Sequence, residues 1–511
     1  MNAKKVLLIY PPNQLMPIDT PRRGESLGML YLAAALERAG FEADILDATV
    51  GTKEDRLEDT FWNPKMQSNG LIRFGMTPAR ISEVIAKGDY GVVGIHSNFT
   101  PQTRMAFEVA VAAKAVSKDI LVLGGGVSAR NLVERFLHSG TVDAICLTEG
   151  EKIVVNAVRA HADGQGLSGV SGIARLRDGT VVRQPVLPTD VYQNLDELPM
   201  PAWHKMPFWH YDRIISPRGV LGGKKRYAPY MSSRGCPFHC DYCHISREKK
   251  YKEESGDIGS LRLKSVHRVV EEVSRLKDLG VTQVSFEDDS LLAKKERVRE
   301  ILTLVRKFGL ELSDINGVNL VHFLKKEGGR LVIDREYLEL LRDAGFEEIV
   351  CPVESASQRI LDKYASGKLN HKTLDVLELI RTATDVGITC LTNIMVGFPD
   401  ETEAEIRESV ELGKKLVEAG AAYVTFFIPI PFPGSMLYEY AITHNHLKQD
   451  FDTDSMNWKN AVMKNTVVPP EKVNELRDWG WRYANTDEHV RSRLEASAGH
   501  RWQSGAPIAT T

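Results

Sequence analysis

The chain has 511 residues, which at about 150 residues per domain corresponds to roughly three domains rather than a lone binding module. Lys and Arg number 65 against 68 Asp and Glu, so no surplus of charge favours nucleic acid or an anionic membrane as a partner. A hydrophobic fraction of 43% and a charged fraction of 26% are typical of a soluble globular protein and exclude a disordered or fibrous one.

The N-terminus carries no pattern of a targeting segment. Residues 1–5 lead directly into the apolar residues 6–10, a run too short for a signal peptide, and no apolar run approaches the 18 residues or so of a membrane span. Three of the 6 cysteines lie within eight positions, which is unlike a secreted disulfide framework. We therefore expect a cytoplasmic protein with no membrane span, in which the cysteine cluster holds metal.

Residues 1–184 alternate short apolar runs with helical patterns, which predicts a doubly wound α/β domain around a buried parallel sheet. The segment 172–184, with Asp178 and Gly179 as its turn, is typical of a closing hairpin. The strands are expected at residues 6–10, 43–46, 92–95, 120–123 and 144–147, and helices at 30–39 and 103–115.

The carboxyl ends of these strands are where such a sheet binds ligands. They carry residues 11–13, 97–99, 124–126 and 148–151. Gly124, Gly125 and Gly126 would let a ligand approach the backbone, but they equally suit a tight strand-to-helix turn. Because no Gly-x-Gly-x-x-Gly motif follows the first strand, a dinucleotide site is disfavoured.

The rest of the chain divides into four regions. Residues 185–228 are rich in Pro and aromatic residues and are interpreted as a linker. From residue 229 to 432 the alternation resumes, which predicts a full or partial (β/α) barrel with its chemistry at the strand carboxyl ends. Residues 433–496 are expected to form a small helical region, and 497–511 a disordered tail. Barrel strands are expected at 230–233, 283–286, 317–320, 348–350, 390–394 and 423–427, and helices at 266–279, 294–308, 335–344, 372–386 and 403–419.

Cys236, Cys240 and Cys243 follow the first predicted barrel strand with the spacing Cys-x3-Cys-x2-Cys. Three thiolates from one loop can ligate three irons of a 4Fe–4S cluster and leave the fourth open to a non-protein ligand. A zinc site completed by His239 or His244, or a group of merely buried cysteines, are the alternatives, although zinc ligands usually come as two separated pairs. The single residues Cys146, Cys351 and Cys390 are interpreted as core residues.

This loop resembles the signature of the radical SAM enzymes. In that family the open iron is chelated by S-adenosylmethionine, which one electron cleaves to a 5′-deoxyadenosyl radical. The resemblance implies that Cys236, Cys240 and Cys243 bind the cluster and that Tyr242 lies beside the adenine.

Further short matches follow at later strand ends. By the same resemblance, Glu287 and Asp288 would contact the amino-acid part of S-adenosylmethionine, Glu354 and Ser355 its ribose, and Gly397, Phe398 and Pro399 its adenine.

A doubly wound domain before such a barrel resembles the cobalamin-dependent radical SAM enzymes, often called class B. The resemblance implies cobalamin contacts along the predicted strand ends and first helix, at Ser26, Leu27, Gly28, Ser97, Asn98, Gly124, Gly125, Gly126, Glu149, Gly150 and Glu151. The Asp-x-His-x-x-Gly motif that supplies a histidine to cobalt in other cobalamin enzymes is absent, and we interpret His96, the only nearby histidine, as structural.

The resemblance implies methyl transfer from methylcobalamin to an unactivated carbon or phosphorus centre, with a second S-adenosylmethionine remethylating the cobalt. Since hydrogen-atom abstraction needs no general base, no catalytic His or Ser is assigned. The layout, including residues 201–204 and 426–429, is similar to antibiotic-pathway enzymes that act on phosphonates. The basic residues Arg247, Lys249, Lys250 and Lys252 either face an anionic substrate or form a solvated surface loop.

Other functions remain open as interpretations of the sequence. The same architecture serves the anaerobic cyclase of chlorophyll synthesis, ring-rearranging oxidases and hopanoid methylases, and the non-enzymatic alternative is a redox-sensing protein. The partners implied are a small-molecule substrate and an electron donor such as flavodoxin or ferredoxin.

Overall fold

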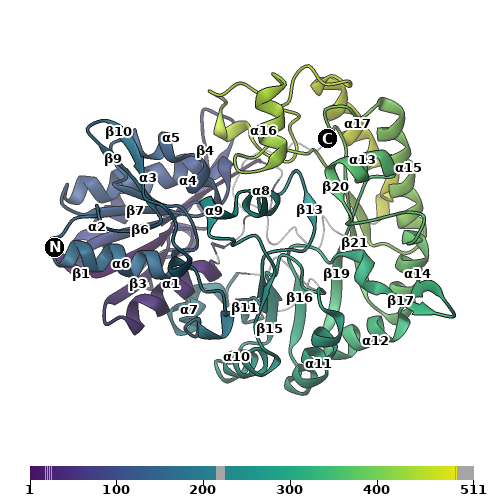
Figure 1. The fold of residues 1–511 in the computed structure, drawn as a ribbon, viewed down its shortest axis with the longest axis horizontal. Coiled ribbons are helices and arrows are strands. Elements are labelled where there is room, and N and C mark those ends of the chain that lie inside the picture. Colours follow the sequence, from purple (N-terminus) through teal and green to yellow (C-terminus); the bar gives the residue numbers. More distant parts are fainter. Residues whose placement is uncertain are drawn as a thin grey trace. The chain divides into compact units, whose positions relative to one another are not determined.

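The computed structural model of the protein describes residues 1–17, 19, 21, 23–24, 26–214, 225–488 and 491. They form two compact units. The first holds the described residues up to 214 together with Tyr251–Ile258, and the second holds 225–250 and the described residues from 259 onward (Figure 1). Part of the expected linker and the expected tail 497–511 lie outside the described residues. Within the described ranges, no helix combines the length and apolar character that a membrane crossing requires.

The first unit is built on a seven-stranded sheet with the order β10-β9-β8-β7-β6-β1-β3. Five of its strands are parallel, which confirms the doubly wound prediction. The parallel strands are β1 (Asn2–Tyr10), β3 (Glu42–Asp47), β6 (Tyr90–His96), β7 (Leu121–Gly125) and β8 (Ala144–Cys146). The chain runs outward in opposite directions from β1 and β6, and this switch point is where a doubly wound sheet offers a ligand crevice.

Helices cover this sheet in pairs. α1 (Leu27–Arg38) packs on α6 (Gly150–Ala162), and α2 (Pro78–Gly88) packs on α3 (Thr103–Val116). The hairpin of β9 (Ile173–Arg177) and β10 (Thr180–Arg183) forms where the Asp-Gly pair predicted it, with positive φ at both turn residues. A small sheet of β2 (Asn13–Leu15), β5 (Ile72–Phe74) and β4 (Lys65–Met66) was not predicted from the sequence.

The second unit is built on six parallel strands in the order β11-β15-β16-β19-β21-β22, so it is a partial barrel with β11 and β22 at its edges. The strands are β11 (Tyr227–Tyr230), β15 (Gln283–Phe286), β16 (Glu311–Asp314), β19 (Phe346–Glu354), β21 (Thr389–Met395) and β22 (Tyr423–Phe427). The helices between them are α10 (Val266–Asp278), α11 (Lys295–Val305), α12 (Arg335–Ala344), α14 (Val376–Val386) and α15 (Glu403–Glu418).

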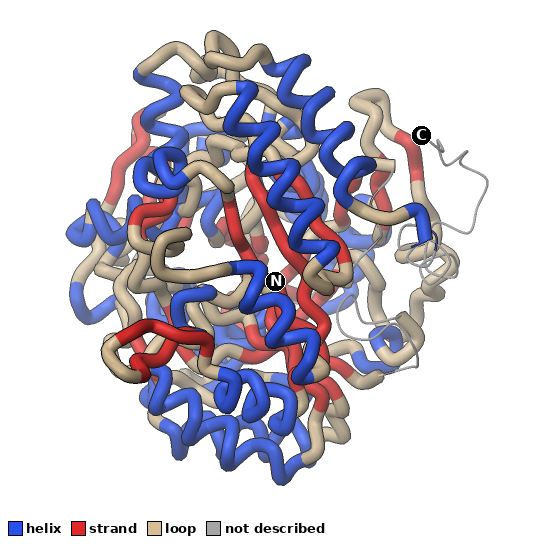
Figure 2. The backbone as a smooth tube through the Cα atoms, turned by 90° about the vertical axis from the view of Figure 1, so that its right-hand side faces the viewer, coloured by secondary structure: helices blue, strands red, loops and turns tan. Residues whose placement is uncertain are grey.

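Two further helices, α16 (Met436–Thr443) and α17 (Pro470–Ala484), follow the last strand. α17 packs on α15 and β22, on the side of the unit that faces the viewer in Figure 2.

The third barrel strand was predicted in the wrong place. Residues 317–320 form a loop that ends in a short 3-10 helix, Leu320–Phe323, while the strand β16 lies earlier in the chain. Gly317 has a φ of +90°, and its N–H donates to Asp314 Oδ2 over 2.8 Å, so the chain turns here instead of extending. The first strand is also shifted, since it ends at Tyr230 rather than Ser233.

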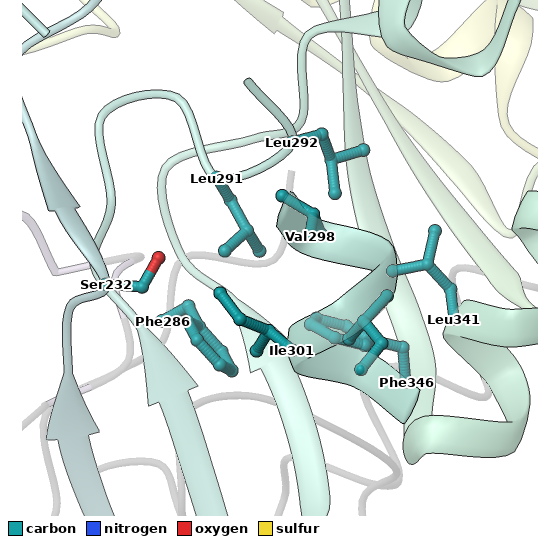
Figure 3. Close-up of a pocket in the computed structure, with 9 residues that line it drawn as sticks. Ser232, Phe286, Leu291, Leu292, Val298, Ile301, Leu341 and Phe346 are labelled. Carbon is teal, nitrogen blue, oxygen red and sulfur yellow. The ribbon is translucent and has the colours of Figure 1, made fainter. Parts of the chain in front are cut away.

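The layer between this sheet and its helices is apolar. Figure 3 shows Phe286 and Phe346 of the sheet facing Ile301 and Val298 of α11 across a small cavity. Apart from Ser232 at its edge, the residues that line this cavity are hydrophobic. It is therefore part of the core that supports the strand ends and not a place for polar chemistry.

Candidate active site

The cysteine loop follows β11 and is held by hydrogen bonds within the second unit. The Cys236 N–H donates to the Gly259 carbonyl over 3.2 Å. Lys249 Nζ donates to the carbonyl oxygens of Cys236, Pro237 and Phe238 over 3.0–3.1 Å. Gly235, with a φ of +76°, lies so close to the backbone of 259–260 that a Cβ would approach a carbonyl oxygen to 2.4 Å. Only glycine fits at this entry to the loop.

All three cysteines are free, and Cys240 is buried while Cys236 and Cys243 are half-buried. Burial raises the pKa of each thiol. Since a thiolate is the form that binds iron, deprotonation at neutral pH requires the positive charge of the bound metal. Three soft sulfur donors on one loop fit a 4Fe–4S cluster with one open iron.

A zinc site finds no support in the geometry. Among the described residues, no three His, Cys, Asp or Glu side chains converge as the ligands of a single metal ion must. Cluster ligands need not converge in this way, because each thiolate binds a different iron. His239 is exposed, and His244 Nδ1 lies 2.8 Å from Glu248 Oε1.

Asp288, just after β15, is engaged in fastening the cysteine loop. Its carboxylate is fully buried and accepts hydrogen bonds from the Ser232 N–H at 2.9 Å, from Ser232 Oγ at 2.7 Å and from Ser233 Oγ at 2.5 Å. Its neighbour Asp289 belongs to the same strand-end motif but was not assigned a contact from the sequence, and its Oδ2 accepts from the Gly235 N–H over 2.9 Å. Glu287 is half-buried, and its N–H donates to the Tyr230 carbonyl.

Glu354 ends β19 in a left-handed conformation with a φ of +66°, an unusual backbone for a residue with a long side chain. Its Oε1 accepts a hydrogen bond from the Tyr242 hydroxyl over 2.8 Å and a second from the ammonium of Lys368. The fold thus joins two of the predicted S-adenosylmethionine contacts. Ser355, by contrast, is fully buried, and its Oγ accepts from the Ser357 N–H.

The turn after β21 holds Gly397, Phe398 and Pro399. Gly397 has a φ of +98°, and a Cβ there would meet Val473 at 2.4 Å. The buried Glu401 carboxylate accepts from the N–H groups of Gly397 at 2.6 Å and Phe398 at 3.1 Å. The Phe398 ring lies 6.1 Å from the Tyr242 ring, so this turn adjoins the cysteine loop.

In the first unit, Ser26 caps the N-terminus of α1 and its Oγ lies 3.2 Å from His96 Nδ1. The His96 ring also stacks on Tyr10 at 4.9 Å, and burial lowers its pKa to about 4. Next to Ser26, Leu27 is buried in the core, whereas Gly28 is exposed on the first turn of the helix.

The three glycines after β7 differ in their surroundings. A Cβ on Gly126 would approach Asn98 Oδ1 to 2.4 Å and the Ser97 carbonyl to 2.5 Å, so this glycine is needed for the turn. Gly124 packs against Ile145, where a Cβ would lie 2.5 Å from a methyl group. A Cβ on Gly125 would meet nothing closer than 4.0 Å, so it alone of the three leaves room beside the backbone.

The loop after β8 leads into α6. Glu149 occupies the N-cap position, Gly150 approaches Leu32, and Glu151 is buried.

The basic segment after the cysteine loop has partners within the chain. Arg247 Nε lies 2.8 Å from Glu439, Lys250 Nζ lies 3.7 Å from the same side chain, and Lys252 Nζ lies 3.5 Å from Asp257. With Lys249 donating to the loop carbonyls, these side chains do not form a set aimed at an anionic substrate.

Two family models match this chain. Residues 19–158 match the B12 binding domain, and residues 230–413 match the radical SAM superfamily. The fold and the cysteine loop thus define an enzyme that joins a cobalamin-binding domain to a radical SAM domain, and its cofactors are a 4Fe–4S cluster, S-adenosylmethionine and cobalamin.

Two relatives that match nearly the whole chain are named methyltransferases. The chain is 28% identical to an uncharacterised methyltransferase of Pyrococcus horikoshii, over 93% of this chain and 91% of that one. It is 27% identical to the cytidylyl-2-hydroxyethylphosphonate methyltransferase of Streptomyces wedmorensis, over 90% and 86%. The chain belongs to the cobalamin-dependent radical SAM methyltransferase family.

Solved structures share the fold. The cobalamin-dependent radical enzyme OxsB superposes with a TM-score of 0.68 at 15% identity, over 97% of this chain and 71% of that one. The methyltransferase TsrM from Kitasatospora setae superposes with a TM-score of 0.61 at 18% identity, over 87% and 78%.

Proposed function

We propose that this enzyme methylates an unactivated carbon or phosphorus centre of a small molecule, and that the substrate is a phosphonate. The observation that carries the proposal is the similarity, along nearly the whole chain, to a methyltransferase that acts on a cytidylyl phosphonate ester. The basic segment 247–252 does not support the anionic substrate, since its side chains already have partners.

When bound, the cluster and S-adenosylmethionine supply a radical that abstracts hydrogen, and cobalamin supplies the methyl group. The residues of the chain would bind and orient these cofactors and would exclude water from the site. We assign Cys236, Cys240 and Cys243 to the cluster, and Tyr242, Glu354 and the 397–399 turn to S-adenosylmethionine. The strained backbone of Glu354 supports a role for its carboxylate, because such conformations cluster at ligand sites.

For cobalamin we assign the strand ends and helix entries of the first unit, at the switch point between β1 and β6. Gly28 and Gly125 support this assignment, since both offer backbone with no side chain in the way. We assign His96 a structural role because its Nδ1 and its ring face already have partners. We keep the domain limits at 1–184, 185–228, 229–432 and 433–496 as part of the proposal.

The test is an anaerobic assay of the reconstituted enzyme with a one-electron reductant and S-adenosylmethionine that carries a deuterated methyl group. Cytidylyl-2-hydroxyethylphosphonate is the first probe. We expect a labelled methyl group in the product, with 5′-deoxyadenosine and S-adenosylhomocysteine as coproducts, and no 5′-deoxyadenosine from Cys240→Ala. A product that forms with S-adenosylmethionine consumed but without label would instead indicate a cyclase or rearrangement reaction. Two relatives are named anaerobic cyclases.

A further inference from the structure

Lys368 is a largely buried cation beside the cysteine loop, and the proposed function gives it no role. Its side chain is 13% exposed and that of its partner Glu354 is 7% exposed. Its ammonium also lies 6.0 Å from the centre of the Tyr242 ring. A charged lysine in such surroundings is costly unless opposite charges offset the loss of water.

The fold brings Lys368 to the cluster ligands through a short strand pair. β20 (Ala365–Ser366) runs antiparallel to β13 (His239–Cys240), with Ala365 opposite Cys240. Gly367, with a φ of +76°, turns the chain back, and the Lys368 N–H donates to the Ala365 carbonyl over 3.0 Å. The position of Lys368 is therefore fixed by the same backbone contacts that fix Cys240.

The contacts of the ammonium place its charge beside the cysteine loop. Lys368 donates to Glu354 Oε1, the same oxygen that accepts from the hydroxyl of Tyr242, which lies between Cys240 and Cys243 in the sequence. Because both partners of this ion pair are largely shielded from water, the Glu354 carboxylate offsets the cost of holding a charged Lys368 here. The positive charge of Lys368 therefore lies next to the loop that carries the sulfur donors.

We propose that Lys368 is a positioning residue for electron transfer, whose ammonium favours uptake of the reducing electron by the cluster held on Cys236, Cys240 and Cys243. The step is a one-electron reduction in which an external donor such as a flavodoxin or ferredoxin loses the electron, and no bond is made or broken. Three thiolates and Glu354 surround the site with negative charge, so an added electron meets repulsion that the ammonium offsets. The inference rests on the proposed assignment of the cysteines.

The test is a redox titration of the reconstituted full-length protein without S-adenosylmethionine, with the reduced cluster followed by electron paramagnetic resonance. Lys368→Met should lower the ratio of reduced to oxidised cluster at a fixed potential by about tenfold, as expected for one charge acting over roughly 10 Å at an effective dielectric constant of about 20. That ratio corresponds to about 59 mV. Lys368→Arg should stay near the wild-type value.

The matched control is Lys372→Met, which removes the same charge from an exposed position four residues later and should leave the potential unchanged. Glu354→Gln should shift the potential in the opposite direction, to a higher value, because it removes a negative charge and keeps the ammonium. A merely structural role of the pair would not give shifts of opposite sign.

A midpoint potential of Lys368→Met equal to that of wild type, at equal iron content, would overturn the proposal. If Lys368→Met loses its iron, the midpoint potential of Glu354→Gln decides the test. A potential of that variant no higher than the wild-type value would reject the proposed role of Lys368. Iron retained in full by Cys240→Ala would reject the ligand assignment itself, and this inference with it.

Discussion

Glu401 offers a sharp test of how the turn after β21 is held. Its carboxylate is fully buried, Oε2 accepts the two N–H groups of Gly397 and Phe398, and Oε1 is a buried atom with no hydrogen bond. Burial, only partly offset by these N–H groups, raises the pKa of Glu401 from 4.5 to about 8. The folded protein therefore binds a proton at this site that the unfolded chain releases at much lower pH.

The sign of the pH effect follows from this difference. Because the pKa is raised in the folded state, the stabilising contribution of Glu401 is complete below pH 4.5 and is lost as the pH rises through about 8. Over this window the free energy of unfolding should fall by up to about 1.4 kcal/mol per pH unit through this one group. Glu401→Gln has a similar shape but no titration, so its stability should not show this fall.

The assay is guanidinium unfolding of the full-length apoprotein and of Glu401→Gln, followed by tryptophan fluorescence between pH 5 and 8. Other titrating groups are common to both proteins and cancel in the difference. We expect the variant to gain stability relative to wild type by about 1 kcal/mol per pH unit across the window. Parallel pH profiles for the two proteins would refute the buried, protonated state of Glu401.

Two further substitutions probe the loops of the two units. Asp288→Ala should destabilise the second unit by about 3–5 kcal/mol and reduce iron retention, because it leaves the buried donors of Ser232 and Ser233 without an acceptor. Thermal unfolding and iron analysis measure these two effects. Full iron retention would contradict the role of Asp288 in holding the cysteine loop. Gly126→Ala should destabilise the first unit by about 2 kcal/mol or more, because the φ of this residue is +106° and the new Cβ would meet backbone. Gly125→Ala should have the same free energy of unfolding as wild type, because its Cβ has room. Equal free energies of unfolding for the two variants would refute this distinction.

Sequence patterns predicted the parts of the fold that depend on local signals. The Asp178-Gly179 pair marked the hairpin because both residues tolerate the positive φ of its turn. The cysteine spacing alone led to the proposed metal loop, without help from the rest of the chain. The third barrel strand was misplaced because residues 317–320 are as apolar as a strand, and only the contact of Gly317 with Asp314 shows that the chain turns there.

The contacts of Lys368 and Asp289 could not have been found in this way. Both act across the fold, Lys368 through a two-residue strand pair with the cysteine loop and Asp289 through a single bond to the Gly235 N–H. Neither contact leaves a periodic pattern in the sequence. A lysine after a Ser-Gly turn is indistinguishable from a surface lysine until the tertiary structure buries it.

The two carboxylates at the ends of β15 and β19 show why the position of a residue does not determine its role. The sequence treats Asp288 and Glu354 alike, as acidic residues at strand carboxyl ends. In the structure both oxygens of Asp288 accept hydrogen bonds from Ser232, so this carboxylate holds the loop that carries the cysteines. Glu354 accepts both of its hydrogen bonds through Oε1. Its backbone is held in a strained left-handed conformation. Glu354 is therefore the carboxylate that we propose to contact a ligand, whereas Asp288 holds the loop that carries the cysteines.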